Sequence, residues 1–128
     1  MQGVFRDDRS SNLKFSELKG RTFKEVIGLE EGSREVVFRG DESYRLWHDQ
    51  DCCESVSIYE VHGDPQDLVG TPILLAEEIE GECLEPPPNA DSYTWTFYKL
   101  ATIKGYVTIR WLGESNGYYS ESVSFGKC

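Results

Sequence analysis

The sequence lacks any long hydrophobic run. None of its 128 residues lies in an apolar stretch close to the roughly 18 residues that a membrane-spanning helix needs. The segment 1–12 carries charges of both signs and no apolar stretch, which argues against a secretory signal peptide. We therefore expect a protein that stays in the cytoplasm and does not associate with membranes.

Basic residues are also scarce. Lys and Arg number 13 and Asp and Glu number 23, which gives a net charge of -10. Nucleic-acid affinity comes mainly from basic residues that displace counterions from phosphates, so direct binding of DNA or RNA is not expected. An acidic surface can serve solubility, or it can dock on a basic surface of a partner protein. Both interpretations remain open at this stage.

Recognisable metal and nucleophile motifs are missing as well. The four cysteines form no C-x-x-C pair, and in the cytoplasm they would be reduced thiols. A weaker hypothesis is a metal-stabilised module, with zinc as its cofactor. Its ligand candidates are His48, Cys52, Cys53 and His62. Adjacent side chains of a strand point to opposite faces, so the two neighbouring cysteines do not easily share one metal, and no cofactor is expected.

Catalysis by a cysteine is equally hard to support. His48 lies four residues before Cys52 and is a conceivable base for the thiol. The carboxylates around it, Asp49, Asp51 and Glu54, would raise the thiol pKa and oppose thiolate formation. We assign no catalytic residue and expect a protein that is not an enzyme.

What the sequence does contain is alternation of apolar and polar residues, with an aromatic content of 12%. Period-two alternation with β-branched and aromatic residues is typical of strands. The predicted strands cover residues 22–28, 35–39, 43–48, 55–62, 72–79, 92–102, 106–112 and 118–125. Residues 72–79 also fit two turns of helix, and the strand is preferred. Short helical turns are predicted at 13–19 and 64–69, the second with Asp64 as its N-cap.

These elements predict a mainly β protein of about seven to eight antiparallel strands. One sheet folded on itself, a small sandwich or a barrel would each bury the apolar faces. The Asn116-Gly117 dipeptide is a strong hairpin signal, so the last three strands are expected to form a meander. We divide the chain into a flexible arm, 1–12, and a single β domain, 13–128. Exposed strand edges make a homodimer plausible.

Two groups of surface residues are candidates for binding. An arginine among aromatic rings can sandwich a base and hold its phosphate, although alternate aromatics are also ordinary sheet residues. The ligand-binding candidates are Trp95, Tyr98, Lys99, Arg110, Trp111 and Tyr118. Acidic residues fit no calcium-binding loop and are more simply a solvated rim, which a partner could contact. The partner-binding candidates are Asp49, Asp51, Glu54, Glu77 and Glu78.

Three stretches carry a resemblance to a known family. They are the H-x-Q-D-C-C-E motif at 48–54, the segment SYTWTFYKLATIKG at 92–105 and the SNGYYS turn at 115–120. Over most of 18–125 the chain resembles a family of small proteins of unknown function encoded by bacteriophages and prophages. The resemblance implies a phage origin and a life in the cytoplasm of an infected bacterium. It implies no activity and no catalytic residues.

The sequence thus favours a non-enzymatic phage accessory protein. The leading hypothesis is an inhibitor of a bacterial defence protein, such as a CRISPR effector, whose nucleic-acid-binding site the acidic surface would occupy. The first alternative is a sponge that sequesters a nucleotide immune signal near Arg110. The second is the metal-stabilised binding module.

Overall fold

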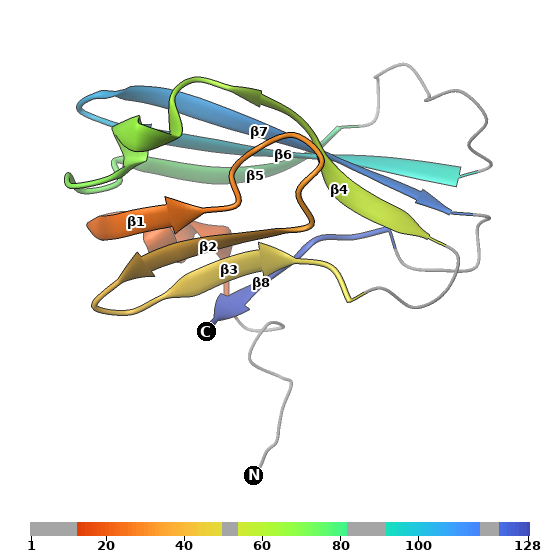
Figure 1. The fold of residues 1–128 in the computed structure, drawn as a ribbon, viewed down its shortest axis with the longest axis horizontal. Helices are drawn as coiled ribbons and strands as arrows, with labels where there is room; N and C mark the ends of the chain where they lie inside the picture. Colours follow the sequence, from red (N-terminus) through yellow and green to blue (C-terminus); the bar gives the residue numbers. More distant parts are fainter. Residues whose placement is uncertain (1–12, 50–53, 82–91, 116–120) are drawn as a thin grey trace, which may run out of the picture.

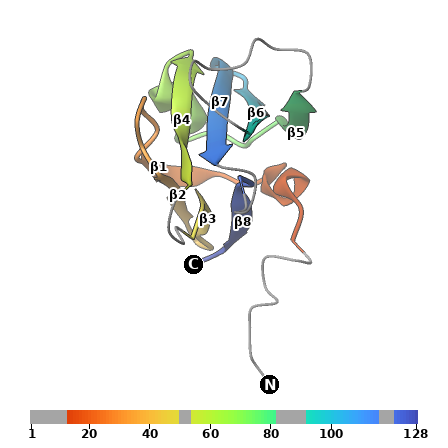
Figure 2. The same cartoon turned by 90° about the vertical axis from the view of Figure 1, so that its right-hand side faces the viewer.

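Two four-stranded antiparallel sheets pack face to face in this protein (Figures 1 and 2). The computed structural model describes residues 13–49, 54–81, 92–115 and 121–128. The first sheet has the order β1-β2-β3-β8, formed by Phe23–Ile27, Glu35–Gly40, Tyr44–Trp47 and Ser124–Lys127. The second has the order β4-β7-β6-β5, formed by Ser55–His62, Gly105–Ser115, Ser92–Thr102 and Leu75–Gly81. The predicted mainly β class is confirmed, with a sandwich as its form.

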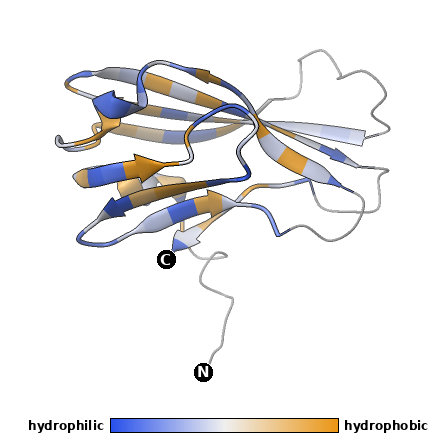
Figure 3. Ribbon diagram, viewed as in Figure 1, coloured by the Kyte–Doolittle hydropathy of each residue, from blue (hydrophilic) through white to orange (hydrophobic). Residues whose placement is uncertain are grey.

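The core lies between the sheets because each strand turns one face inward. Figure 3 shows apolar and polar residues following one another along the strands of both sheets. On β7, Val107, Ile109 and Trp111 are fully buried in this core. On the first sheet, Phe38 and Leu46 occupy equivalent inward positions. The two sheets therefore bury complementary apolar faces, which is the main stabilisation of the sandwich.

A short helical turn closes the gap between β5 and β8 (Figure 2). This 3-10 turn, η1 (Phe15–Leu18), buries Phe15 and Leu18. The Phe15 ring lies 4.6 Å from that of Tyr98 and 5.4 Å from that of Phe125, so it contacts both sheets. The second predicted turn is also present as η2 (Pro65–Leu68), and the Asp64 side chain accepts from the backbone N–H of Gln66.

Two predicted strands need correction. Residues 72–79 do form a strand rather than a helix, but it begins only at Leu75. The expected final strand, 118–125, appears as β8, Ser124–Lys127, and it pairs with β3 of the other sheet, where Phe125 lies opposite Leu46. The meander therefore stops at β6 and β7, because the chain crosses between sheets before β8. The Asn116-Gly117 dipeptide lies outside the described residues.

Strand β4 contains an irregularity that its sequence hints at. The pairing with β7 shifts between Ile58 and Glu60, which marks a β-bulge at Tyr59. The bulge returns Val61 to the core side, where it packs against the core with Val56 and Ile58. A strictly alternating strand would have placed Val61 on the outer face. Within the described part of the chain, no helix is long and apolar enough to cross a membrane.

Candidate functional site

Negative charge is concentrated in the middle of the chain. Residues 46–98 contain twelve Asp and Glu and no Lys or Arg, whereas the remaining residues carry 13 basic and 11 acidic side chains. The middle segment includes β4 and β5, which form the two edges of the second sheet. β5 therefore brings exposed carboxylates to one edge of this sheet, whereas Glu60 on β4 is paired with Arg110.

The acidic edge of the protein is β5, and we use that name for its residues Leu75–Ile79. Glu77 and Glu78 are both exposed, as the sequence analysis expected of partner-binding residues. A groove of about 600 Å³ lies between this strand and η1. It is lined by Leu13, Lys14, Phe15, Ser16, Ala76, Glu77, Glu78 and Ile79. The acidic edge thus combines exposed carboxylates with an adjoining depression of mixed polarity.

A second group, the outer cluster, lies on the outward face of β4, β6 and β7. Arg110 forms an ion pair with Glu60, and its guanidinium lies 5.2 Å from the centre of the Trp95 ring and 5.3 Å from that of Tyr59. The two aromatic rings meet edge to face at 5.1 Å. His62 lies 3.1 Å from Glu60. The guanidinium donates to Glu60 and so holds the pKa of that carboxyl below its usual value.

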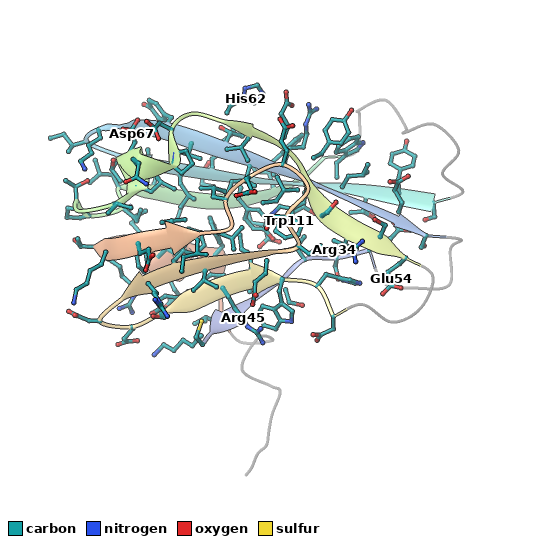
Figure 4. All side chains as sticks on the ribbon, viewed as in Figure 1. Arg34, Arg45, Glu54, His62, Asp67 and Trp111 are labelled. Carbon is teal, nitrogen blue, oxygen red and sulfur yellow. The ribbon has the colours of Figure 1, made fainter. Side chains whose placement is uncertain are left out.

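The outer cluster contains only part of the predicted ligand site. Arg110 and Trp95 come together, and Lys99 lies exposed on the neighbouring strand. Tyr98 and Trp111 are fully buried and point into the core (Figure 4 labels Trp111), so they do not contact anything bound on the outer face. Alternation along β6 and β7 explains this correction, because neighbouring residues face opposite sides. Tyr118 lies outside the described residues.

A third group, the end cluster, is polar and mostly buried at the end of the sandwich where β4 begins. His48 Nδ1 lies 2.8 Å from the Ser122 carbonyl oxygen, and its Nε2 lies 2.9 Å from Glu54 Oε2. A carbonyl oxygen only accepts, so His48 Nδ1 is the donor of this hydrogen bond. The His48 and Glu54 side chains are 5% and 1% exposed. Glu54 is therefore removed from the predicted partner-binding surface, whereas Asp49 stays exposed and accepts from Trp47 Nε1.

Glu121 belongs to the same end of the sandwich. Its carboxyl accepts from Thr94 Oγ1 at 2.8 Å and from Ser115 Oγ at 2.6 Å. Burial alone would raise the pKa of Glu121, but hydrogen bonds from Ser115, Ser92 and Thr94 outweigh it, and the pKa is lowered. A Cβ at Gly113 would meet the Glu121 carbonyl oxygen at 2.2 Å, so only glycine admits this close passage. Among the described residues, the hydrogen-bond donors to the Glu121 carboxyl are thus neutral hydroxyl groups.

The two histidines among the predicted metal ligands, His48 and His62, lie far apart. His48 contacts Glu54, directly before β4, whereas His62 ends that strand, opposite Thr108 (Figure 4 labels Glu54 and His62). An eight-residue strand spans roughly 23 Å at about 3.3 Å per residue, far beyond the reach of one ion. Among the described residues, no group of three or more His, Cys, Asp or Glu side chains is placed to hold a metal. Cys52, Cys53 and Asp51 lie outside the described residues.

The sequence analysis missed three residues of these clusters. Tyr59 and Glu60 belong to the outer cluster because the bulge directs both outward, and the odd spacing of Val56, Ile58 and Val61 was a signal for it. Glu121 was missed because its partners Thr94 and Ser115 lie far away in the sequence or on another strand. Spacing along the chain gives no signal for such a contact.

Comparison with known proteins places the chain in a family. A family model described as Domain of unknown function (DUF7448) matches residues 16–125. The chain belongs to this family. The DUF7448 match begins within η1 and ends within β8, so it includes both sheets of the sandwich. No curated protein and no solved structure matches the chain. The family description assigns no activity, so function must be argued from the sites themselves.

Proposed function

We propose that this chain is a non-enzymatic, phage-encoded accessory protein that binds and inhibits a bacterial defence protein. The observation that carries the proposal is the charge segregation: residues 46–98 hold twelve acidic and no Lys or Arg residues, and the exposed carboxylates of β5 lie at one edge of a sheet. Complementary charge speeds association and selects partners of opposite sign. The partner class with a large basic surface is a protein that handles nucleic acid, and defence effectors belong to it.

The sandwich supplies a rigid support for such a surface. The acidic edge is hydrogen-bonded along its length to β6, which in turn pairs with all eleven residues of β7. Carboxylates on a preorganised strand lose little conformational freedom when a partner binds, and less of the interaction energy is spent on ordering. Phage origin and the cytoplasm of the infected host come from the resemblance noted in the sequence analysis, and they form part of the same proposal.

The nucleotide sponge draws less support from the geometry. Arg110 is already paired with Glu60, so an incoming phosphate would have to displace that carboxylate. Two of the six predicted ligand residues, Tyr98 and Trp111, are in the core. The outer cluster is better explained as a structural group in which an ion pair packs against two aromatic rings.

Affinity capture tests the proposal. Tagged protein is incubated with lysate of a bacterium that carries an active defence system, and the recovered proteins are identified. The expected partner binds nucleic acid, is displaced by added nucleic acid and elutes as NaCl rises from about 0.05 to about 0.5 M, because salt screens charge contacts. Recovery of no nucleic-acid-binding protein, or of one that added nucleic acid fails to displace, would contradict the proposal.

A further inference from the structure

We propose that the acidic edge takes up a basic, extended peptide segment of a partner protein as an additional strand. This inference rests on the proposed function and gives it a binding mode. In the part of the chain that the structure describes, β5 is the last strand of its sheet and pairs only with β6. An edge strand presents backbone N–H and C=O groups to the outside, and strand addition uses those groups.

The protein's own chain begins to cover this edge and then leaves it. Gly20 N–H donates to the Ile73 carbonyl at 2.7 Å, and Ile73 N–H donates to the Arg21 carbonyl at 2.9 Å. At Gly20, which has a φ of 88°, the chain departs into η1. The backbone pairing therefore stops at Ile73, just before β5 begins at Leu75. An incoming peptide would continue a pairing that the fold has already started.

The groove beside the edge matches a strand of alternating character. Its apolar lining includes Leu13, partly buried against the core, and Ile79, which is 40% exposed. Its charged lining is Glu77, Glu78 and the single base Lys14. A strand with apolar residues on one face and basic residues on the other would contact both kinds of lining at once.

Charge selects the occupant. A second copy of this chain would bring its own Glu77 and Glu78 against those of the first, and like charges directly opposite one another are destabilising. A basic strand reverses the sign of that interaction. The structure also favours β5 over β4, the other edge of the same sheet, as the site of strand addition. On β4, Gly32 N–H donates to Ile58, and Ile58 N–H donates to Ser33, so a turn of the protein already occupies that edge.

The test is an NMR titration of the full chain with the peptide Lys-Val-Lys-Val-Lys-Val-Lys. We expect the amide signals of 75–79 and 13–18 to shift together. A peptide of the same charge with proline replacing each valine is the control, because proline removes the backbone N–H at every second position and fixes φ, which disfavours a paired strand. The variant Glu77→Lys/Glu78→Lys should weaken binding by about ten-fold, equivalent to about 1.4 kcal/mol. The matched charge change Glu30→Lys/Glu31→Lys, on an exposed turn of the first sheet, should leave affinity unchanged.

Three results would overturn the inference. They are equal loss of affinity in both double variants, equal binding of the proline peptide, and shifts confined to residues away from β5 and η1. Contacts between amides of 1–12 and of β5 before any peptide is added would also overturn it, because the groove would then hold the protein's own segment. The proposed function and the binding mode can be tested apart from each other. If Glu77→Lys/Glu78→Lys still captures a nucleic-acid-binding partner from lysate, the binding mode is wrong and the proposed function stands.

Discussion

At the scale of single residues, the contacts that matter most are those made by buried polar groups. His48 and Glu54 face each other at 2.9 Å with almost no solvent exposure. His48 also links the end of β3 to the Ser122 carbonyl, close to where the chain enters β8. Removing Glu54 therefore takes the buried Nε2 of His48 away from its hydrogen-bond partner. The pair therefore links the two connections that run between the sheets, the one from β3 to β4 and the one from β7 to β8.

The variant Glu54→Leu should lower the free energy of unfolding by about 3–5 kcal/mol, because His48 loses its buried partner. Urea denaturation measures the change. The double variant His48→Leu/Glu54→Leu should cost less than the sum of the two single variants, since neither side chain is then buried without the other. Additive costs would show that the two side chains do not depend on each other.

Glu121 predicts a pH dependence with a defined sign. Hydroxyl donors, acting against partial burial, lower the pKa of this carboxyl from its ordinary 4.5 in the folded protein. A group with a depressed folded pKa contributes stability above its unfolded pKa, and that contribution is lost as pH falls through the folded value. The difference in unfolding free energy between wild type and Glu121→Gln should therefore shrink when urea denaturation is repeated from pH 6 down to about pH 3. A difference in unfolding free energy that stays constant with pH would show that the ionised Glu121 carboxyl does not stabilise the folded protein.

At the scale of elements, β8 shows best where prediction from sequence stops. The bounds of β4 and β6, 55–62 and 92–102, agree with the structure because their alternation is long and their ends carry polar or turn residues. The pairing of β8 with β3 was missed. The Asn-Gly signal favours a local hairpin, whereas the partner strand lies some 80 residues away in the sequence. Local patterns report that a strand exists, but only the packing of the two sheets decides its neighbour.

A β8 of four residues depends on its one large apolar side chain. Phe125 stacks on Tyr44 with ring centres 5.7 Å apart and contacts Phe15. Phe125→Ala should destabilise the protein by about 3–5 kcal/mol through the cavity it leaves. Tyr106→Ala is the control, since Tyr106 is 75% exposed on β7, and it should change stability by less than about 0.5 kcal/mol. Urea or thermal unfolding of the two variants measures the loss of stability in each. Equal losses would contradict the role of Phe125 in holding β8 against the core.

The candidate sites were predicted less completely than the fold. Exposed carboxylates at Glu77 and Glu78 follow from a charge run on a strand, and the structure places them at an edge. The predicted ligand group failed at Tyr98 and Trp111 because the sequence alone did not show which face of β6 and β7 points inward. The end cluster brings together residues from β6, β7 and two connections, so no local spacing could indicate it.

At the scale of the whole molecule, the net charge predicts a monomer, even though β5 leaves one sheet edge open among the described residues. A turn of the chain covers β4, and Thr22 and Phe23 bridge to Pro72 and Val69 beside β1. The net charge of -10 makes copies repel one another. Sedimentation velocity should show a single monomeric species at low salt. A stable dimer would contradict this prediction, and it would restore the homodimer that strand edges had suggested from the sequence.

We propose that this protein acts by contact, through an acidic surface, on a bacterial defence protein. The most direct measurement is the efficiency of plating of a defence-sensitive phage on three strains: a defended host, the same host expressing the protein, and a host without the defence. We predict that expression raises plating on the defended host toward the level of the undefended host, and that Glu77→Lys/Glu78→Lys reduces this effect. Unchanged plating on defended hosts that accumulate the folded protein would contradict the claim.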